Sequence, residues 1–125
     1  MRVKDVMCKF NDIAVTSPNT IFKDTLIKMT EKPLGCICII EENRKLIGIL
    51  TDGDIRRVLQ RFDNVLNIEI SNVMTVNPIT IHENAPLVEA LALMENRINQ
   101  ISVLPVVENE VIIGLIRIHD IIGKQ

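Results

Sequence analysis

The sequence has almost no aromatic residues and no long apolar run. Only 2% of its 125 residues are aromatic, and Trp and Tyr are absent. So few rings argue against a stacking platform for single-stranded nucleic acid, and a formal net charge of −2 gives no basic surface for a duplex. No apolar run approaches the roughly 20 residues that span a bilayer, and the opening Met-Arg-Val-Lys-Asp is too polar for a signal peptide. The sequence therefore predicts neither a nucleic-acid partner nor a membrane one.

Cysteine is scarce as well, with Cys8, Cys36 and Cys38 as its three positions. An odd count in a chain with an ample apolar fraction of 47% indicates a reducing compartment, so we expect a cytoplasmic location. Cys36 and Cys38 are two residues apart in a predicted strand, and they are either half a metal site or small core residues. Because no second Cys/His pair has suitable spacing, we expect no metal.

Catalytic patterns are also missing. No Ser or Cys has a base nearby, no pair of glutamates marks a polar pocket, and the phosphate-loop pattern Gly-x-x-x-x-Gly-Lys-Ser/Thr does not occur. We therefore expect that this chain alone is not an enzyme and that it requires no cofactor.

The most informative stretch runs from Gly48 to Arg57 and reads Gly-Ile-Leu-Thr-Asp-Gly-Asp-Ile-Arg-Arg. An apolar run ends there at a hydroxyl and two carboxylates, and a helical pattern then begins. The start of a helix has unpaired N–H groups and a partial positive charge, which suit an anionic, hydroxyl-rich ligand. A weaker copy, Gly-Leu-Ile-Arg-Ile-His-Asp-Ile, runs from Gly114 to Ile121.

These two joints belong to an internal duplication. Landmarks recur 65 to 67 positions apart, as in the pairs Met7/Met74, Leu26/Leu91, Gly48/Gly114 and Asp54/Asp120. Agreement this close predicts two repeats, residues 1–66 and 67–125. Each repeat reads β-α-β-β-α, so the fold class is α/β (α+β). A unit of about 60 residues with helices on one side only must bury its other sheet face. We therefore expect pseudo-two-fold packing, with the joints around a shared cleft.

The elements expected within this plan follow from turns and periodicity. One helix should begin with Thr20 as its N-cap and another with Asn84 or Ala85, which places Pro86 in the first turn. The strands are expected at residues 13–16, 36–40, 46–50, 78–81, 101–107 and 111–116, and the helices at 20–32, at 52–60, and from 84 or 85 onward.

The Val6-Met7 and Val73-Met74 pairs, together with the two joints, resemble a tandem cystathionine-β-synthase (CBS) domain pair, or Bateman module. The resemblance extends over nearly the whole chain. It implies that an adenine nucleotide or another nucleotidyl ligand binds in the central cleft and regulates an attached enzyme or transporter. It also implies a homodimer formed through the helices that follow Asp54 and Asp120.

A closer resemblance rests on Leu34-Gly35, on the joint from Gly48 to Arg57, and on the closing Arg117-Ile118-His119-Asp120-Ile121-Ile122. These segments are similar to the C-terminal CBS pair of bacterial D-arabinose 5-phosphate isomerases. Those enzymes interconvert ribulose 5-phosphate and arabinose 5-phosphate, for the synthesis of 3-deoxy-D-manno-octulosonate (Kdo), a lipopolysaccharide precursor. The resemblance implies a regulatory fragment whose parent chain carries a sugar-isomerase domain. It also implies CMP, CMP-Kdo or an adenine nucleotide as ligand, because nothing in the residues distinguishes cytosine from adenine.

Thr51 and Asp54 match the Ser/Thr-x-x-Asp element of this family. A hydroxyl at a helix start can donate to a phosphate oxygen, and the carboxylate can accept from both ribose hydroxyls. The alternative is a helix cap, with Thr51 as N-cap and Asp54 in the first turn. Arg57 either faces the same ligand or lies on a solvated face paired with acids.

The second joint departs from the family pattern, because Arg117 stands where a hydroxyl is expected. Arg117 either binds a phosphate bidentately or is a solvated arginine at a strand end. Asp120 is the counterpart of Asp54, and the neighbouring His119 is a ligand candidate or a surface residue. The resemblance adds Thr16 and Thr80, whose extended region contacts the base in CBS pairs. We expect one well-formed site at Thr51 and Asp54 and a weaker one at Asp120.

Two functions remain open at this stage. One is a regulatory module that binds a nucleotide or a nucleotide-sugar. The other is a purely structural pair that mediates oligomerisation and keeps only a vestigial cleft.

Overall fold

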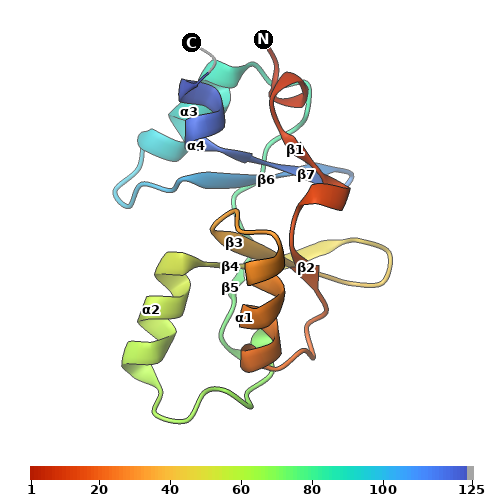
Figure 1. Ribbon diagram of the computed structural model, residues 1–125. Helices are drawn as coiled ribbons and strands as arrows, with labels where there is room; N and C mark the ends of the chain where they lie inside the picture. Colours follow the sequence, from red (N-terminus) through yellow and green to blue (C-terminus); the bar gives the residue numbers. More distant parts are fainter. Residues whose placement is uncertain (124–125) are drawn as a thin grey trace. The chain divides into compact units, whose positions relative to one another are not determined.

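The longest strands of the computed structural model, which describes residues 1–123, form two antiparallel hairpins (Figure 1). In one hairpin β3 (Cys36–Ile40) pairs with β4 (Leu46–Thr51), and in the other β6 (Val103–Glu108) pairs with β7 (Val111–Arg117). Each hairpin belongs to its own unit. The Asp54 unit comprises Ile13–Pro78, and the Asp120 unit combines Met1–Asp12 with the segment that begins at Ile79.

The Asp54 unit has a four-stranded sheet covered by two helices. The strand order is β2-β3-β4-β5, in which β2 (Val15–Thr16) is parallel to β3, and β5 (Thr75–Val76) is antiparallel to β4. Helices α1 (Phe22–Glu31) and α2 (Asp52–Arg61) lie on the same side of this sheet (Figure 1). The core between helices and sheet includes Phe22, Met29, Ile37, Ile39, Leu50 and Val58.

The Asp120 unit repeats this plan with a three-stranded sheet, in the order β1-β7-β6. Strand β1 (Cys8–Lys9) is antiparallel to β7, and α3 (Leu87–Glu95) packs beside α4 (Ile118–Ile122) (Figure 1). Short 3₁₀ helices, η1 (Val3–Asp5), η2 (Phe10–Asp12) and η3 (Ile70–Asn72), precede or follow the short edge strands β1 and β5. The core includes Val3, Ala90, Met94, Leu104, Ile116 and Ile121.

The predicted fold class is confirmed, since residues 1–123 form a mixed α+β structure with two sheets and four α-helices, and β3 has the predicted bounds. The strand predicted at 78–81 is wrong, because this region makes a single parallel bridge between Ile81 and Val106. The repeat bounds 1–66 and 67–125 remain a prediction from the sequence. The compact units are not these repeats, because Met1–Asp12 packs with the segment that begins at Ile79.

Both predicted helix caps are wrong. The N-cap of α1 is Ile21, and the first helical N–H groups, those of Phe22 and Lys23, donate to the carbonyls of Ile68 and Leu66. The Thr20 hydroxyl bonds to Thr16 instead. The N-cap of α3 is likewise Pro86, and the Leu87 N–H donates to the carbonyl of Met1. Carbonyls distant in sequence thus replace local side-chain caps.

A glycine in each hairpin allows a close approach at the sheet edge. Gly48 of β4 faces the Met74 side chain, and Gly114 of β7 faces the backbone carbonyl of Cys8. A Cβ at Gly114 would lie 2.5 Å from that carbonyl oxygen. The edge strands β5 and β1 pair beside these two glycines, so the glycines decide whether each sheet can be completed.

Both cysteines of β3 are core residues, as one of the two interpretations predicted. Cys36 and Cys38 are 2% and 1% exposed. A hydrogen bond between the two side chains and burial raise the pKa of the Cys38 thiol well above its usual value. Between residues 1 and 123, no helix is long and apolar enough to cross a bilayer.

Prediction from the two glycines: Gly114→Ala should lower the free energy of unfolding more than Gly48→Ala. The new methyl group at Gly114 meets backbone, whereas at Gly48 it meets the flexible Met74 side chain. Overpacking of this kind costs about 1–3 kcal/mol. Urea unfolding of the purified variants measures the difference. Gly53→Ala is the matched control, because its Cβ would make only ordinary contacts, and a cost at Gly53 equal to that at Gly114 would contradict the explanation.

Candidate functional site

The first joint is a strand that ends in a helix cap. Strand β4 ends at Thr51, which has extended backbone and is the N-cap of α2. The Asp54 N–H donates to the Thr51 hydroxyl at 3.1 Å, and the Thr51 N–H donates to the Asp54 carboxylate at 2.9 Å. The arrangement is a capping box, which satisfies two backbone donors reciprocally. The capping interpretation of these residues is therefore confirmed as local structure.

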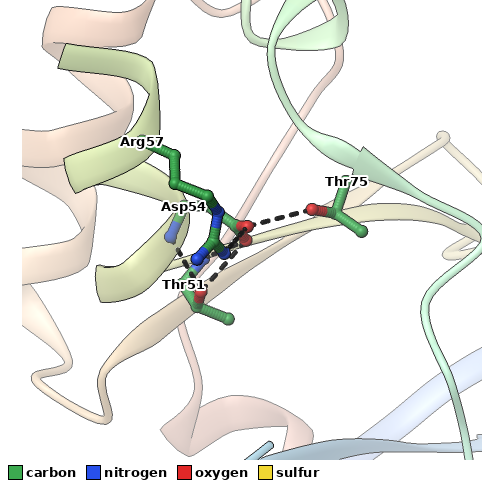
Figure 2. A network of polar contacts seen from close by, with 4 residues as sticks. All are labelled: Thr51, Asp54, Arg57 and Thr75. Atoms are coloured by element: carbon green, nitrogen blue, oxygen red, sulfur yellow. Dashed lines mark hydrogen bonds and ion pairs between the residues drawn. The ribbon is translucent and has the colours of Figure 1, made fainter. Parts of the chain in front are cut away.

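The Asp54 carboxylate accepts three further hydrogen bonds beyond the two of the capping box (Figure 2). Its Oδ2 atom accepts a second bond from the Thr51 hydroxyl at 3.0 Å. Its Oδ1 atom accepts from Arg57 Nη2 at 2.7 Å and from the Thr75 hydroxyl at 3.1 Å. Thr75 comes from β5, so three elements meet at one carboxylate.

The environment keeps Asp54 ionised. Burial by itself raises the pKa of Asp54, but the bonds from the Thr51 N–H, the Arg57 guanidinium and the two threonine hydroxyls outweigh burial. The pKa of this carboxyl therefore lies below its usual value. The Asp54 side chain is 11% exposed, whereas that of Arg57 is 66% exposed. The negative charge is thus held inside the unit, and its cation lies at the surface.

A cavity of about 270 Å³ opens beside this network, between α2 and the segment leading into β5. It presents one carboxylate, two arginines, polar side chains and an apolar wall. Arg57 and Arg61 are four positions apart, so they lie on one face of α2. The Arg61 guanidinium is 5.7 Å from the centre of the Phe62 ring, within cation–π range. The lining residues are Asp54, Arg57, Val58, Arg61, Phe62, Asn72, Val73, Met74 and Thr75.

The second joint has the same backbone plan with different chemistry. Arg117 ends β7 and is the N-cap of α4, and its N–H donates to Asp120 Oδ2 at 3.1 Å. Its guanidinium binds the same carboxylate through Nε at 3.0 Å and Nη2 at 2.8 Å. The bidentate partner of Arg117 in this structure is thus a carboxylate of its own turn. Burial raises the pKa of Asp120, but the bonds and charge of Arg117, together with His119, hold it below its usual value.

Thr16 and Thr80 lie apart from these two networks, whereas His119 is next to Asp120 in α4 and helps to lower its pKa. Thr16 is buried, and its hydroxyl bonds to Thr20 at 2.7 Å and to Lys28 Nζ at 3.1 Å. Thr80 is half-buried in an irregular segment, and His119 is exposed in the first turn of α4. The structure therefore brings together Thr51, Asp54 and Arg57 in one unit. In the other unit it brings together Arg117 and Asp120.

Two residues of the first site were missed by the sequence reasoning, namely Thr75 and Arg61. Thr75 directly follows the Val73-Met74 landmark, which was the available signal. Arg61 is one helical turn beyond Arg57, but helical spacing alone does not separate a cavity wall from a solvated face. Within the part of the chain that the structure describes, no group of three or more His, Cys, Asp or Glu could hold a metal ion.

The comparison with known families agrees with this duplicated geometry. The family model "CBS domain" matches twice, at residues 3–61 and 70–125. The chain belongs to the CBS-domain family. The two matches cover both joints, and a CBS pair is a regulatory rather than a catalytic module.

Curated relatives connect this CBS pair with one enzyme. The chain is 34% identical to the arabinose 5-phosphate isomerase KdsD of Yersinia pestis over 122 residues, and 33% identical to KdsD of Escherichia coli. An uncharacterised protein of Rickettsia prowazekii is 36% identical over the same length. Each alignment covers 98% of this chain but only 37% of the relative. The chain is therefore related to the CBS region of KdsD.

Solved CBS pairs share the fold. The CBS pair of protein MJ0100, solved in complex with 5′-methylthioadenosine and S-adenosyl-L-methionine, is 26% identical with a TM-score of 0.85. That alignment covers 100% of this chain and 98% of the other. CBSX2, solved in complex with AMP, is 22% identical with a TM-score of 0.78, covering 98% of this chain and 94% of the other.

Prediction from the depressed pKa values: the stability of the protein should fall as the pH drops below about 5, partly because of Asp54. A carboxylate with a lowered folded-state pKa contributes stability above its unfolded pKa. That contribution disappears as the pH falls through the folded value. Asp54→Asn should therefore be less stable at neutral pH and should lose less between pH 6 and pH 3. Urea unfolding of both proteins at several pH values in this range measures how steeply the free energy of unfolding of each depends on pH.

The control for the acid titration is Asp63→Asn, which replaces an exposed carboxylate in the connection after α2. The free energy of unfolding of this variant should change with pH as steeply as that of the unmodified protein. An unchanged slope in Asp54→Asn would contradict the account of the buried network.

Proposed function

We propose that this chain is a regulatory CBS pair that binds a nucleotide beside Asp54. The observation that carries the proposal is a buried, ionised carboxylate that faces a cavity lined by Arg57 and Arg61. Ribose presents neighbouring hydroxyl donors, and phosphate presents anionic acceptors, so both halves of a nucleotide find complementary groups. AMP and adenosine-type ligands in the related CBS pairs support this class of ligand.

In this proposal, different residues around the cavity contact the ribose and the phosphate of the nucleotide. Asp54 accepts hydrogen bonds from the ribose hydroxyls, and Arg57 and Arg61 bind phosphate oxygens. Thr51 donates its hydroxyl to a phosphate oxygen or keeps the carboxylate oriented. The volume of about 270 Å³ is near the lower end of ligand pockets, which span about 300–1,000 Å³. It suits the phosphorylated ribose, with the base extending beyond it.

The relationship to KdsD supports a proposal about the ligand and the parent protein. We propose that the effector is CMP, CMP-Kdo or an adenine nucleotide, and that a sugar-isomerase domain in the parent protein responds to it. Regulation requires that the effector bind two arrangements of the protein with different affinities. Cys8, Cys36 and Cys38 form no disulfide in the structure, which suits the cytoplasm.

The second joint is the weaker site in this proposal. Asp120 is already bound bidentately by Arg117, so a ligand there must compete with a charge-assisted pair. His119, Thr16 and Thr80 remain secondary ligand candidates, and the cleft shared by both joints remains a prediction from the sequence.

Prediction from the Asp54 network: Asp54→Ala should weaken nucleotide binding about tenfold or more, because an unpaired buried hydroxyl costs on the order of 1–3 kcal/mol. Titration calorimetry with AMP and CMP measures the affinity. Asp120→Ala, at the equivalent position of the second joint, is the matched comparison and should have the smaller effect. Unchanged affinity in a folded Asp54→Ala protein would remove Asp54 from the site.

The alternative function, an oligomerisation module, is favoured by exposed apolar side chains near the ends of the helices. Leu59 on α2 is 53% exposed, Leu66 after it 50%, and Ile122 on α4 55%. Such residues could form the homodimer contact through the helices that follow Asp54 and Asp120.

Prediction for this alternative: Leu59→Glu should convert a dimer to a monomer in sedimentation, because it places a charge in the apolar contact. Ile27→Glu, a change at 52% exposure on α1, should not. A stable dimer without any thermal shift at millimolar nucleotide would favour the alternative over nucleotide binding.

A further inference from the structure

The Asp54 carboxylate has no remaining capacity for a ligand in this structure. It accepts four hydrogen bonds, from the Thr51 N–H, the Thr51 hydroxyl, the Thr75 hydroxyl and Arg57. A carboxylate offers about four lone-pair positions. A ribose that donates two hydroxyls to Asp54 must therefore displace two of the donors that are already bound.

The four donors differ in how easily they can leave. The Thr51 N–H donates to Asp54 as part of the capping box of α2. The Thr51 hydroxyl caps the helix as an acceptor from the Asp54 N–H, so the proton that it donates to Asp54 can turn to a ligand phosphate without breaking the cap. Thr75 is held on β5, which pairs with β4 at Gly48 and Ile49. The Arg57 guanidinium is at the end of a flexible side chain that is 66% exposed, so it can move into water without any backbone change. The two donors that a ligand displaces are therefore the Thr51 hydroxyl on Oδ2 and Arg57 on Oδ1.

The departure of Arg57 separates an ion pair, and part of that cost is recovered if the guanidinium binds a new anion nearby while the ribose hydroxyls donate to Asp54. A phosphate in the adjoining cavity supplies that anion, and Arg61 lines the same cavity. A phosphorylated riboside satisfies both groups at once. An unphosphorylated riboside offers hydroxyls to Asp54 but nothing to Arg57.

We propose that Arg57 is a specificity-determining gate, which opens Asp54 to ribosides that carry a phosphate and keeps it closed to those that do not. This inference rests on the proposed nucleotide site at Asp54. The distinction matters within the family, since one related CBS pair is solved with AMP and another with 5′-methylthioadenosine and S-adenosyl-L-methionine. The residue three positions after the ribose-binding aspartate decides between these classes in this chain.

The test compares AMP with adenosine, and CMP with cytidine, by titration calorimetry on the unmodified chain and on Arg57→Met. The methionine keeps an apolar stem of similar reach but has no donor and no charge. We expect adenosine or cytidine to bind more tightly to the variant, because one donor fewer must be displaced. We expect AMP or CMP to bind less tightly. The ratio of the affinity for the nucleotide to the affinity for the nucleoside should fall about tenfold or more, because the variant loses one charge-assisted hydrogen bond.

Two further variants sharpen the test. Arg56→Met changes the neighbouring exposed arginine, which does not line the cavity, and should leave both affinities unchanged. Arg57→Lys keeps the charge without the planar fork and should keep part of the discrimination. Circular dichroism and thermal unfolding confirm that each variant is folded.

The possible results separate the two proposals. If Arg57→Met binds AMP or CMP with the same ratio of nucleotide to nucleoside affinity as the unmodified chain, the result contradicts the role of Arg57 but not the nucleotide site. Equal weakening of both ligand classes also overturns the gate, since Arg57 would then only support the site. Binding of neither class by the unmodified chain overturns both proposals. Opposite changes for the two classes establish the gate.

Discussion

Each sheet of this CBS pair depends on a short edge strand that pairs beside a glycine. Strand β5 pairs with β4 at Gly48, and β1 pairs with β7 at Gly114. A side chain at either glycine would collide with Met74 or with the backbone of Cys8. This pairing assigns Met1–Asp12 to the unit of the second hairpin. It also places the Thr75 hydroxyl against Asp54, so the geometry of the candidate site follows from how the sheet edge is completed.

The cap and the candidate ligand site at Asp54 use the same atoms. A buried charge requires partners, and here a helix start, a neighbouring strand and a surface arginine supply them. Capping and ligand binding are therefore not exclusive interpretations of Thr51 and Asp54. The capping bonds hold the carboxylate in place, and the proposed exchange with a ligand takes place at the bond to the exposed Arg57 side chain.

The two repeats have diverged in chemistry while keeping their backbone plan. Both joints form a bond from the N-cap N–H to an aspartate three residues later. At the first joint the N-cap residue is Thr51, and Arg57 approaches the carboxylate from the following turn. At the second joint the N-cap residue is Arg117 itself, which takes two positions on Asp120. The two joints, which differ in sequence at Thr51 and Arg117, thus give different partners to the equivalent carboxylates of Asp54 and Asp120.

The sequence by itself determined the duplication, both hairpins and the position of each joint, because these depend on local apolar runs and turns repeated at a constant offset. Tertiary structure decided the N-caps at Ile21 and Pro86, because the carbonyls of Leu66, Ile68 and Met1 accept the first helical N–H groups in place of the predicted caps. It also decided that Thr75 of β5 donates to Asp54. Bonds between segments distant along the chain leave no periodic signal, so local pattern could not reveal them.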